Sequence, residues 1–159
     1  MTMRLDSHDR ALLALMQRDA RCGLAALAAE TGLSPASVQR RLKALRDGRA
    51  ITGEVAIVDP KAVGMPMSFV VMVELERERQ DELDAFIRRA RAEPMVQQCY
   101  YVTGEADFCL ICLAADMDAF EALTKRLFFD TSYVRRFRTS VVMGRNKVGL
   151  GVPTDAPAP

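Results

Sequence analysis

Apolar residues recur at helical spacing in three successive stretches of the first fifty positions. This spacing places them on one face of a helix, so the pattern predicts three amphipathic helices at about 6–19, 23–31 and 34–48. Asp6 and Ser34 are good N-cap residues for the first and third helices, because their side-chain oxygens can accept hydrogen bonds from first-turn amides. The N-terminal part is therefore expected to be a small helical domain.

The remainder of the chain alternates between strand-like and helix-like patterns. The expected elements are a strand at 68–76, a helix around 83–90, strands at 96–103 and 108–114, a helix around 120–127 and a strand at 134–143. This βαββαβ order predicts an α+β, ferredoxin-like domain, in which an antiparallel sheet carries two helices on one face. In the stretches 69–73 and 109–113 both the odd and the even positions are apolar, so both faces of the sheet carry apolar residues. We therefore expect a second subunit to cover the face without helices.

These patterns divide the chain into four segments. We expect a helical domain at 1–51, a linker strand at 52–66, the ferredoxin-like domain at 67–148 and a disordered tail at 149–159. Pro and Gly residues break the linker pattern, and the tail is rich in Pro and Ala.

The two parts of the chain differ in charge. The net charge of the 159 residues is +1, but residues 1–50 carry nine Lys/Arg against five Asp/Glu, and the remainder carries thirteen against sixteen. A basic module joined to a mildly acidic one predicts that the first part meets a polyanion. No apolar run approaches the roughly 18 residues that cross a bilayer, and the N-terminus lacks a signal-peptide core. We therefore expect a cytoplasmic protein without a membrane partner.

The four cysteines are interpreted as structural. Cys22, Cys99, Cys109 and Cys112 are too few and too scattered for a disulfide framework. Cys109 and Cys112 resemble half a zinc site, but residues three apart on a strand point to opposite faces and cannot bind one ion together. We expect no metal and no cofactor.

Three residues have the spacing of a helix-turn-helix motif. Such a motif needs a small residue where its two helices cross, a glycine in the tight turn and an apolar residue that anchors the second helix. Ala28, Gly32 and Val38 occupy these places. The surrounding core would be filled by Leu27, Leu33 and Leu42. The alternative is a structural three-helix element that binds no nucleic acid.

The polar and basic residues of the third helix point away from its buried face. Gln can pair with an adenine edge, Arg with guanine or phosphate, and Lys with phosphate, while first-turn amides also bind phosphate. Arg41 lies at the flank of the buried face, where it can bind the DNA backbone or a neighbouring carboxylate. The candidate DNA-contacting residues are Ser34, Pro35, Ser37, Gln39, Arg40, Arg41 and Lys43. For Arg46 and Arg49 a solvated basic surface is the alternative.

Several motifs in both halves have the residues and spacing of one protein family. They are Leu5-Asp6-x-x-Asp9, Gly32-Leu33-Ser34-Pro35-x-x-Val38-x-x-Arg41-x-x-x-Leu45, Ile51-x-Gly53 and Thr103-Gly104-x-x-Asp107. Over about residues 4–148 the chain resembles the Lrp/AsnC (feast/famine) family of transcriptional regulators. The resemblance implies a winged helix-turn-helix, a ferredoxin-like (RAM) domain that dimerises through its sheet, and homodimers assembled into a ring, with an octamer expected, that binds double-stranded DNA.

The resemblance also implies a small-molecule effector, an amino acid or a related metabolite, bound between dimers near the turn at 104–107. Turn amides can hold a carboxylate, and an aspartate can neutralise an α-ammonium group. The candidate effector-binding residues are Thr103, Gly104, Glu105, Asp107 and Thr139. The alternative for Gly104 and Asp107 is an ordinary hairpin turn.

The chain departs from the family pattern before its last strand. Many members have Leu-Pro-Gly where this chain has Phe129-Asp130-Thr131-Ser132-Tyr133, followed by Arg135, Arg136 and Arg138. These residues put the effector response in doubt, so an effector-independent architectural DNA-binding protein is the alternative function.

An enzymatic function is not expected. The same two-domain plan resembles a small group of tetrapyrrole decarboxylases, which use a histidine of the second domain, but the only histidine here is His8, in the first helix. The sequence has no catalytic triad pattern and no glycine-rich phosphate loop.

Overall fold

The computed structural model describes residues 4–77, 79–129 and 132–154. The chain divides into two compact units. The first unit combines the residues up to 56 with those from 147 onward, and the second spans 57–146. The sequence did not indicate that the C-terminal segment returns to the first unit.

The first unit contains three helices, which confirms the helical periodicity of the sequence. They are α1 (Ser7–Arg18), α2 (Leu24–Thr31) and α3 (Pro35–Asp47). Asp6 and Asp9 form a capping box at the start of α1, and Gly32 ends α2 with φ +68°, a left-handed conformation that favours glycine. The helices bury one apolar core, formed by Leu12, Met16, Leu27, Ala28, Val38, Leu42 and Leu45.

The segment that follows α3 is extended. Residues 53–59, all described, form no strand, so the wing implied by the family resemblance and the expected linker strand are not formed there. A short 3-10 helix, Pro60–Val63, follows Asp59, whose side chain accepts a hydrogen bond from the amide of Lys61.

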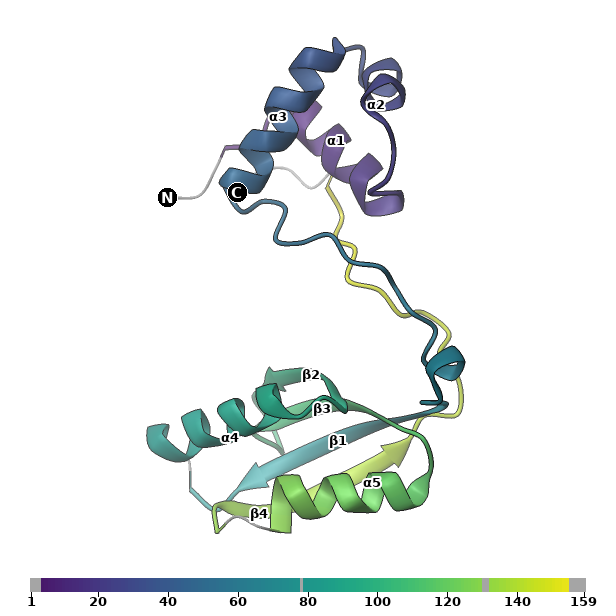
Figure 1. Cartoon of the computed structure of the whole chain (residues 1–159). Helices are drawn as coiled ribbons and strands as arrows, with labels where there is room; N and C mark the ends of the chain where they lie inside the picture. Colours follow the sequence, from purple (N-terminus) through teal and green to yellow (C-terminus); the bar gives the residue numbers. More distant parts are fainter. Residues whose placement is uncertain (1–3, 78, 130–131, 155–159) are drawn as a thin grey trace. The chain divides into compact units, whose positions relative to one another are not determined.

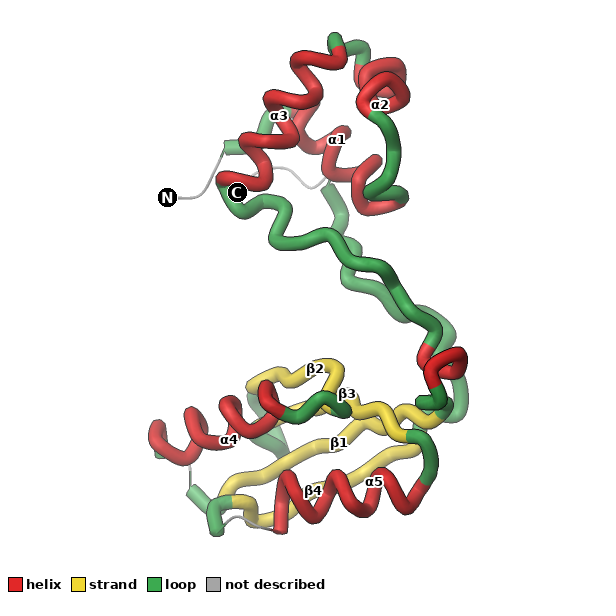
Figure 2. The backbone as a smooth tube through the Cα atoms, viewed as in Figure 1, coloured by secondary structure: helices red, strands yellow, loops and turns green. Residues whose placement is uncertain are grey.

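The second unit has the expected βαββαβ order (Figure 1). Its elements are β1 (Met67–Leu75), α4 (Gln80–Ala92), β2 (Val96–Tyr101), β3 (Phe108–Ala114), α5 (Met117–Thr124) and β4 (Val134–Val141). A π-helix, Lys125–Phe129, continues α5. The strands are all antiparallel, in the order β2-β3-β1-β4, as a ferredoxin-like fold requires (Figure 2).

The two faces of the sheet differ in burial. The inner face joins α4 and α5 in one core, and Phe69, Phe86 and Phe108 are fully buried there. The other face, which we call the outer face, has a band of half-buried apolar residues, formed by Val70, Met72, Cys109, Ile111 and Leu113. Helices cover one face, as expected, and within the single chain the outer face keeps part of its apolar surface in contact with solvent.

The C-terminal segment of the first unit is hydrogen-bonded to α1. The side-chain amide of Gln17 donates to the carbonyl of Val152 at 3.0 Å and accepts from its N–H at 2.7 Å. Arg10 donates to the carbonyl of Thr154 at 2.9 Å. The sequence predicts a disordered tail at 149–159, but the structure describes this segment up to Thr154 and shows it bonded to α1. Residues 155–159 lie outside the described part of the chain.

Candidate DNA and effector sites

The solvent side of α3 carries the polar residues expected to contact DNA. Gln39, Arg40 and Lys43 are exposed, on the side of the helix away from its buried residues. Lys43 Nζ lies 2.5 Å from Asp47 Oδ2, one turn further on, and both side chains are exposed. Because such an exposed pair contributes little stability in water, Lys43 can exchange this carboxylate for a phosphate at small cost.

The first turn of α3 is capped and open to solvent. Ser34 Oγ accepts a hydrogen bond from the Ser37 amide at 3.3 Å, and Pro35 occupies the first helical position. Arg40 Nη2 donates to Ser37 Oγ at 3.4 Å, which holds the guanidinium near this turn. The first-turn amides and a cation therefore lie together, an arrangement suited to an anion.

Arg41 differs from its neighbours because it is turned toward α1. Its Nη1 lies 2.8 Å from Asp6 Oδ2 and 2.7 Å from Asp9 Oδ1, and the Asp9 side chain is only 8% exposed. Hydrogen bonds from Arg41 to Asp9 and Asp6 raise the pKa of Arg41, while the Asp9 amide and then Arg41 lower the pKa of Asp6. Of the two partners considered for Arg41, the structure shows the neighbouring carboxylate, so Arg41 joins α3 to the cap of α1.

The turn between β2 and β3 is held to β1 by Asp107. The Asp107 amide donates to the carbonyl of Val73 at 2.9 Å, and Asp107 Oδ2 accepts from the amide of Leu75 at 2.7 Å. This second bond falls where the β1–β4 register shifts between Glu74 and Leu75. Gly104 has φ +120°, which favours glycine. Asp107 therefore supports the turn structurally, and one carboxylate oxygen already has a backbone partner.

The same turn is connected to β4 by a group of charged residues that the sequence did not place together. Glu74 Oε1 lies 2.7 Å from Arg136 Nη2 and 3.2 Å from Arg138 Nη2, and Arg138 also reaches Glu105 Oε2 at 3.3 Å. The Glu74 side chain is 14% exposed, whereas that of Glu105 is 88% exposed. The basic start of the last strand was visible in the sequence, but its acidic partners lie more than thirty positions away.

The other two effector candidates are less closely tied to the turn. Thr103 and Thr139 are exposed, and Thr139 pairs with Val71 in the β1–β4 ladder. Its neighbour Arg138 is the β4 residue that contacts the turn. The structure therefore brings Gly104, Glu105 and Asp107 together but does not join Thr139 to them.

The segment directly before β4, residues 129–133, is where the chain departs from the family pattern. Phe129 ends the π-helix, and its exposed ring makes an edge contact with Phe137. Asp130 and Thr131 lie outside the described residues. Arg136 and Arg138 are the residues of this segment that contact the turn's surroundings, through Glu74 and Glu105.

The cysteines occupy the positions expected of structural residues. Cys112 is fully buried, and burial raises its pKa to about 12, whereas Cys109 lies half-buried on the outer face. Within the described part of the chain, no group of three or more His, Cys, Asp or Glu side chains could hold a metal ion. None of the described helices is long and apolar enough to cross a membrane. His8 is exposed on α1.

The fold and these surfaces define a class of protein: a transcriptional regulator with a helix-turn-helix domain and a ligand-binding domain. Residues 5–46 match the model of the AsnC-type helix-turn-helix domain, and residues 68–150 match that of the Lrp/AsnC ligand binding domain. The chain belongs to the Lrp/AsnC family.

Relatives agree with this assignment. An HTH-type transcriptional regulator of Sinorhizobium fredii is 46% identical over 96% of this chain and 90% of its own length. The DNA-binding transcriptional activator DecR of Escherichia coli is 28% identical over 95% of this chain and 99% of its own. The crystal structure of a transcriptional regulator from Neisseria meningitidis in complex with L-Met has a TM-score of 0.89 at 27% identity, covering 96% of this chain and 98% of that one.

Proposed function

We propose that this DNA-binding regulator contacts double-stranded DNA through the exposed side of α3. The observation that carries the proposal is the contrast along this helix, where apolar residues are buried against α1 and α2 while Gln39, Arg40 and Lys43 are exposed. Gln39 and Arg40 would contact base edges, and Lys43 and the first turn from Ser34 would bind phosphates.

The test is fluorescence anisotropy on DNA from upstream of the protein's own gene, against a scrambled duplex of equal length. Specific sites usually bind at least about 10³-fold tighter than non-specific DNA. Gln39→Ala should reduce this preference. Lys43→Ala should instead lower the affinity for both duplexes alike, and the salt dependence of binding should fall by about one released counterion. Arg88→Ala, an exposed change on α4, is the matched control. Undiminished preference in Gln39→Ala and Arg40→Ala would contradict the proposed recognition surface.

We also infer that the turn at 103–107 binds an amino-acid effector. The neisserial relative in complex with L-Met and the ligand-binding domain of the family support an effector of this kind. The Gly104 region can present amides to a carboxylate, and the second oxygen of Asp107 can accept from an α-ammonium group. This function is regulatory rather than enzymatic, and it requires neither a metal nor another cofactor. A regulator with this function would act in the cytoplasm.

Calorimetry with a panel of amino acids tests the effector proposal. Asp107→Asn keeps an oxygen that can accept from the Leu75 amide but loses the negative charge, so effector affinity should fall by about tenfold or more while the fold is retained. If the wild-type protein binds none of the amino acids, the result would favour the alternative, an effector-independent architectural DNA-binding protein. That alternative rests on the departure from the family pattern before β4, and the bond from the Leu75 amide to Asp107 adds to it, because it occupies one carboxylate oxygen of the proposed site.

We further propose that a second copy of the chain covers the outer face of the sheet. Its half-buried band is continuous, because Val70 pairs with Ile111 and Met72 pairs with Cys109 in adjacent strands. A band of this kind is typical of an interface between subunits. The octamer implied by the family resemblance would be built from such dimers.

A further inference from the structure

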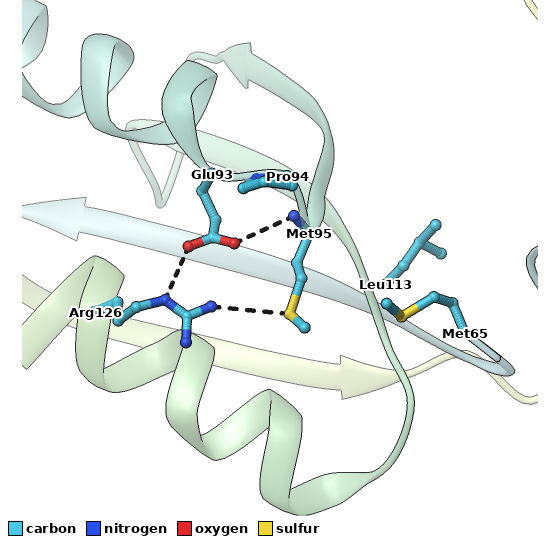
Figure 3. Close-up of a pocket in the computed structure, with 6 residues that line it drawn as sticks. All are labelled: Met65, Glu93, Pro94, Met95, Leu113 and Arg126. Atoms are coloured by element: carbon cyan, nitrogen blue, oxygen red, sulfur yellow. Dashed lines mark hydrogen bonds and ion pairs between the residues drawn. The ribbon is translucent and has the colours of Figure 1, made fainter. Parts of the chain in front are cut away.

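A cavity of about 420 Å³ opens in the second unit, at the end of β3 far from the effector turn. Its lining residues are Met65, Glu93, Pro94, Met95, Leu113 and Arg126 (Figure 3). Leu113 is the second-last residue of β3, whereas the turn at 103–107 directly precedes Phe108, the first residue of this strand. With a rise of about 3.4 Å per residue, the two places are separated by roughly 20 Å along the strand.

The cavity contains one ion pair in a partly buried setting. Arg126 Nε lies 3.0 Å from Glu93 Oε2, and the amide of Met95 donates to Glu93 Oε1 at 3.2 Å. The Glu93 side chain is 12% exposed, and that of Arg126 is 49% exposed. Burial acts to raise the pKa of Glu93, but the hydrogen bonds from Arg126 and Met95 outweigh it and keep the pKa below its ordinary value. Glu93 is therefore a fixed carboxylate, and Arg126 beside it is more accessible.

Both members of the pair can bind further groups. A guanidinium has five N–H donors and a carboxylate about four acceptor positions. Arg126 directs Nε to Glu93 and Nη2 to the Met95 sulfur, 3.9 Å away, so Nη1 is not used in these contacts. An isolated anion at Arg126 would be repelled by Glu93, and an isolated cation at Glu93 would be repelled by Arg126. A molecule that carries both charges avoids either repulsion.

The rest of the lining is apolar. Met65, Met95 and Leu113 contribute two thioether chains and one branched chain, and methionine side chains adapt to ligands of different shape. The close-up shows Met65 and Leu113 beside one another, to one side of the Glu93–Arg126 pair (Figure 3). A cavity of a few hundred Å³ with an apolar wall and a few polar groups is typical of small-molecule sites.

We propose that this cavity binds an apolar α-amino acid. Arg126 holds the carboxylate, Glu93 accepts from the α-ammonium group, and the side chain lies against Met65, Met95 and Leu113. This site is separate from the turn at 103–107 and does not depend on the function proposed for that turn. The protein then has two small-molecule sites in one domain.

The test is NMR of the full-length protein labelled at its methionine methyl groups. The signals of Met65 and Met95 are assigned with Met65→Leu and Met95→Leu and followed during titration with L-norleucine. Both methyl signals should shift and saturate at millimolar ligand. Hexanoate lacks the ammonium group of norleucine and pentylamine lacks its carboxylate, so each should bind about tenfold more weakly or worse.

Two variants separate this site from the effector turn. Arg126→Gln should weaken norleucine binding by about tenfold or more, whereas Asp107→Asn should leave the Met65 and Met95 shifts unchanged. The comparison of ligands on the wild-type protein keeps the test valid if Arg126→Gln fails to fold. Unmoved methyl signals, equal binding of hexanoate or pentylamine, or loss of the shifts in Asp107→Asn would each overturn the proposal.

Discussion

Arg40 and Arg41 are adjacent in the sequence but face different surroundings. Arg40 is exposed near the first turn of α3, whereas Arg41 contacts Asp6 and Asp9 and is 27% exposed. Replacing Arg41 leaves the buried Asp9 carboxylate without its cation. We therefore expect Arg41→Gln to lower the free energy of unfolding of the first unit by about 2 kcal/mol. Urea unfolding followed by circular dichroism measures this change.

Arg40→Gln is the matched control for this prediction. It removes the same charge from an exposed position, so the free energy of unfolding should change by no more than about 0.5 kcal/mol, while DNA affinity falls. Equal stability of the two variants would contradict the assignment of Arg41 as the link between α3 and α1.

Glu74 gives a prediction on pH. Its hydrogen bond from Arg136 lowers its pKa below the ordinary value of 4.5, against the opposing effect of burial. A carboxyl whose pKa is depressed on folding stabilises the protein above its unfolded pKa, and this stabilisation is lost as the pH falls through the folded pKa. Wild-type stability should thus fall more steeply below pH 4.5 than that of Glu74→Gln.

Calorimetric unfolding across neutral to acidic pH measures the two slopes. Glu76→Gln, at an exposed position just beyond β1, is the control and should keep the wild-type slope. If the stability of Glu74→Gln fell with pH along the same slope as that of the wild type, the ion pairs of Glu74 with Arg136 and Arg138 would not be formed in solution.

At the scale of elements, two side chains of α1, Arg10 and Gln17, hold the C-terminal segment. The Gln17 amide both donates to and accepts from the backbone of Val152, as a neighbouring strand would. Gln17→Ala removes both bonds, so hydrogen exchange at the Val152 amide should accelerate while exchange in the core of α1 is unchanged. Gln17→Glu keeps an acceptor for the Val152 amide and should give an intermediate rate. Unaltered exchange in Gln17→Ala would show that other contacts hold the segment.

Elements with a regular period could be predicted from the sequence, and contacts between distant elements could not. The helices α1 to α3 and the strand pair β2–β3 follow from spacing and turn residues, and the exposed side of α3 follows from the helical wheel. The π-helix after α5 has no such signal. The expected tail shows the same limit, because its composition indicates disorder, while its hydrogen bonds to α1 come from Arg10 and Gln17, far away in the sequence.

The candidate sites show the same division. The turn at 103–107 was predicted from its residues, but the bond from Asp107 to the Leu75 amide depends on the register of β1. The pair of Glu93 and Arg126 joins positions 33 apart, so no local pattern indicates it. Local periods determine which residues share a face, whereas the packing of elements determines which charges meet.

At the scale of the whole molecule, the outer face of the sheet decides the assembly. Ile111 lies in the middle of its apolar band, between Val70 of β1 and Gln98 of β2 in the strand pairing. A glutamate there would be buried without a cation if a second sheet packs on this face, and such a charge costs several kcal/mol. In a single chain the side chain at 111 is half-buried, so the same glutamate would reach solvent.

Ile111→Glu should therefore dissociate the oligomer while the second unit keeps its fold. Sedimentation velocity measures the mass, and circular dichroism confirms the fold. Arg88→Glu, an even larger change of charge on the exposed side of α4, should retain the wild-type mass. Because interfaces built from such a face depend on its apolar centre, Met72→Lys should dissociate the oligomer as well. If both outer-face variants kept the wild-type mass, the subunits would associate through another surface and the outer face would need a different partner.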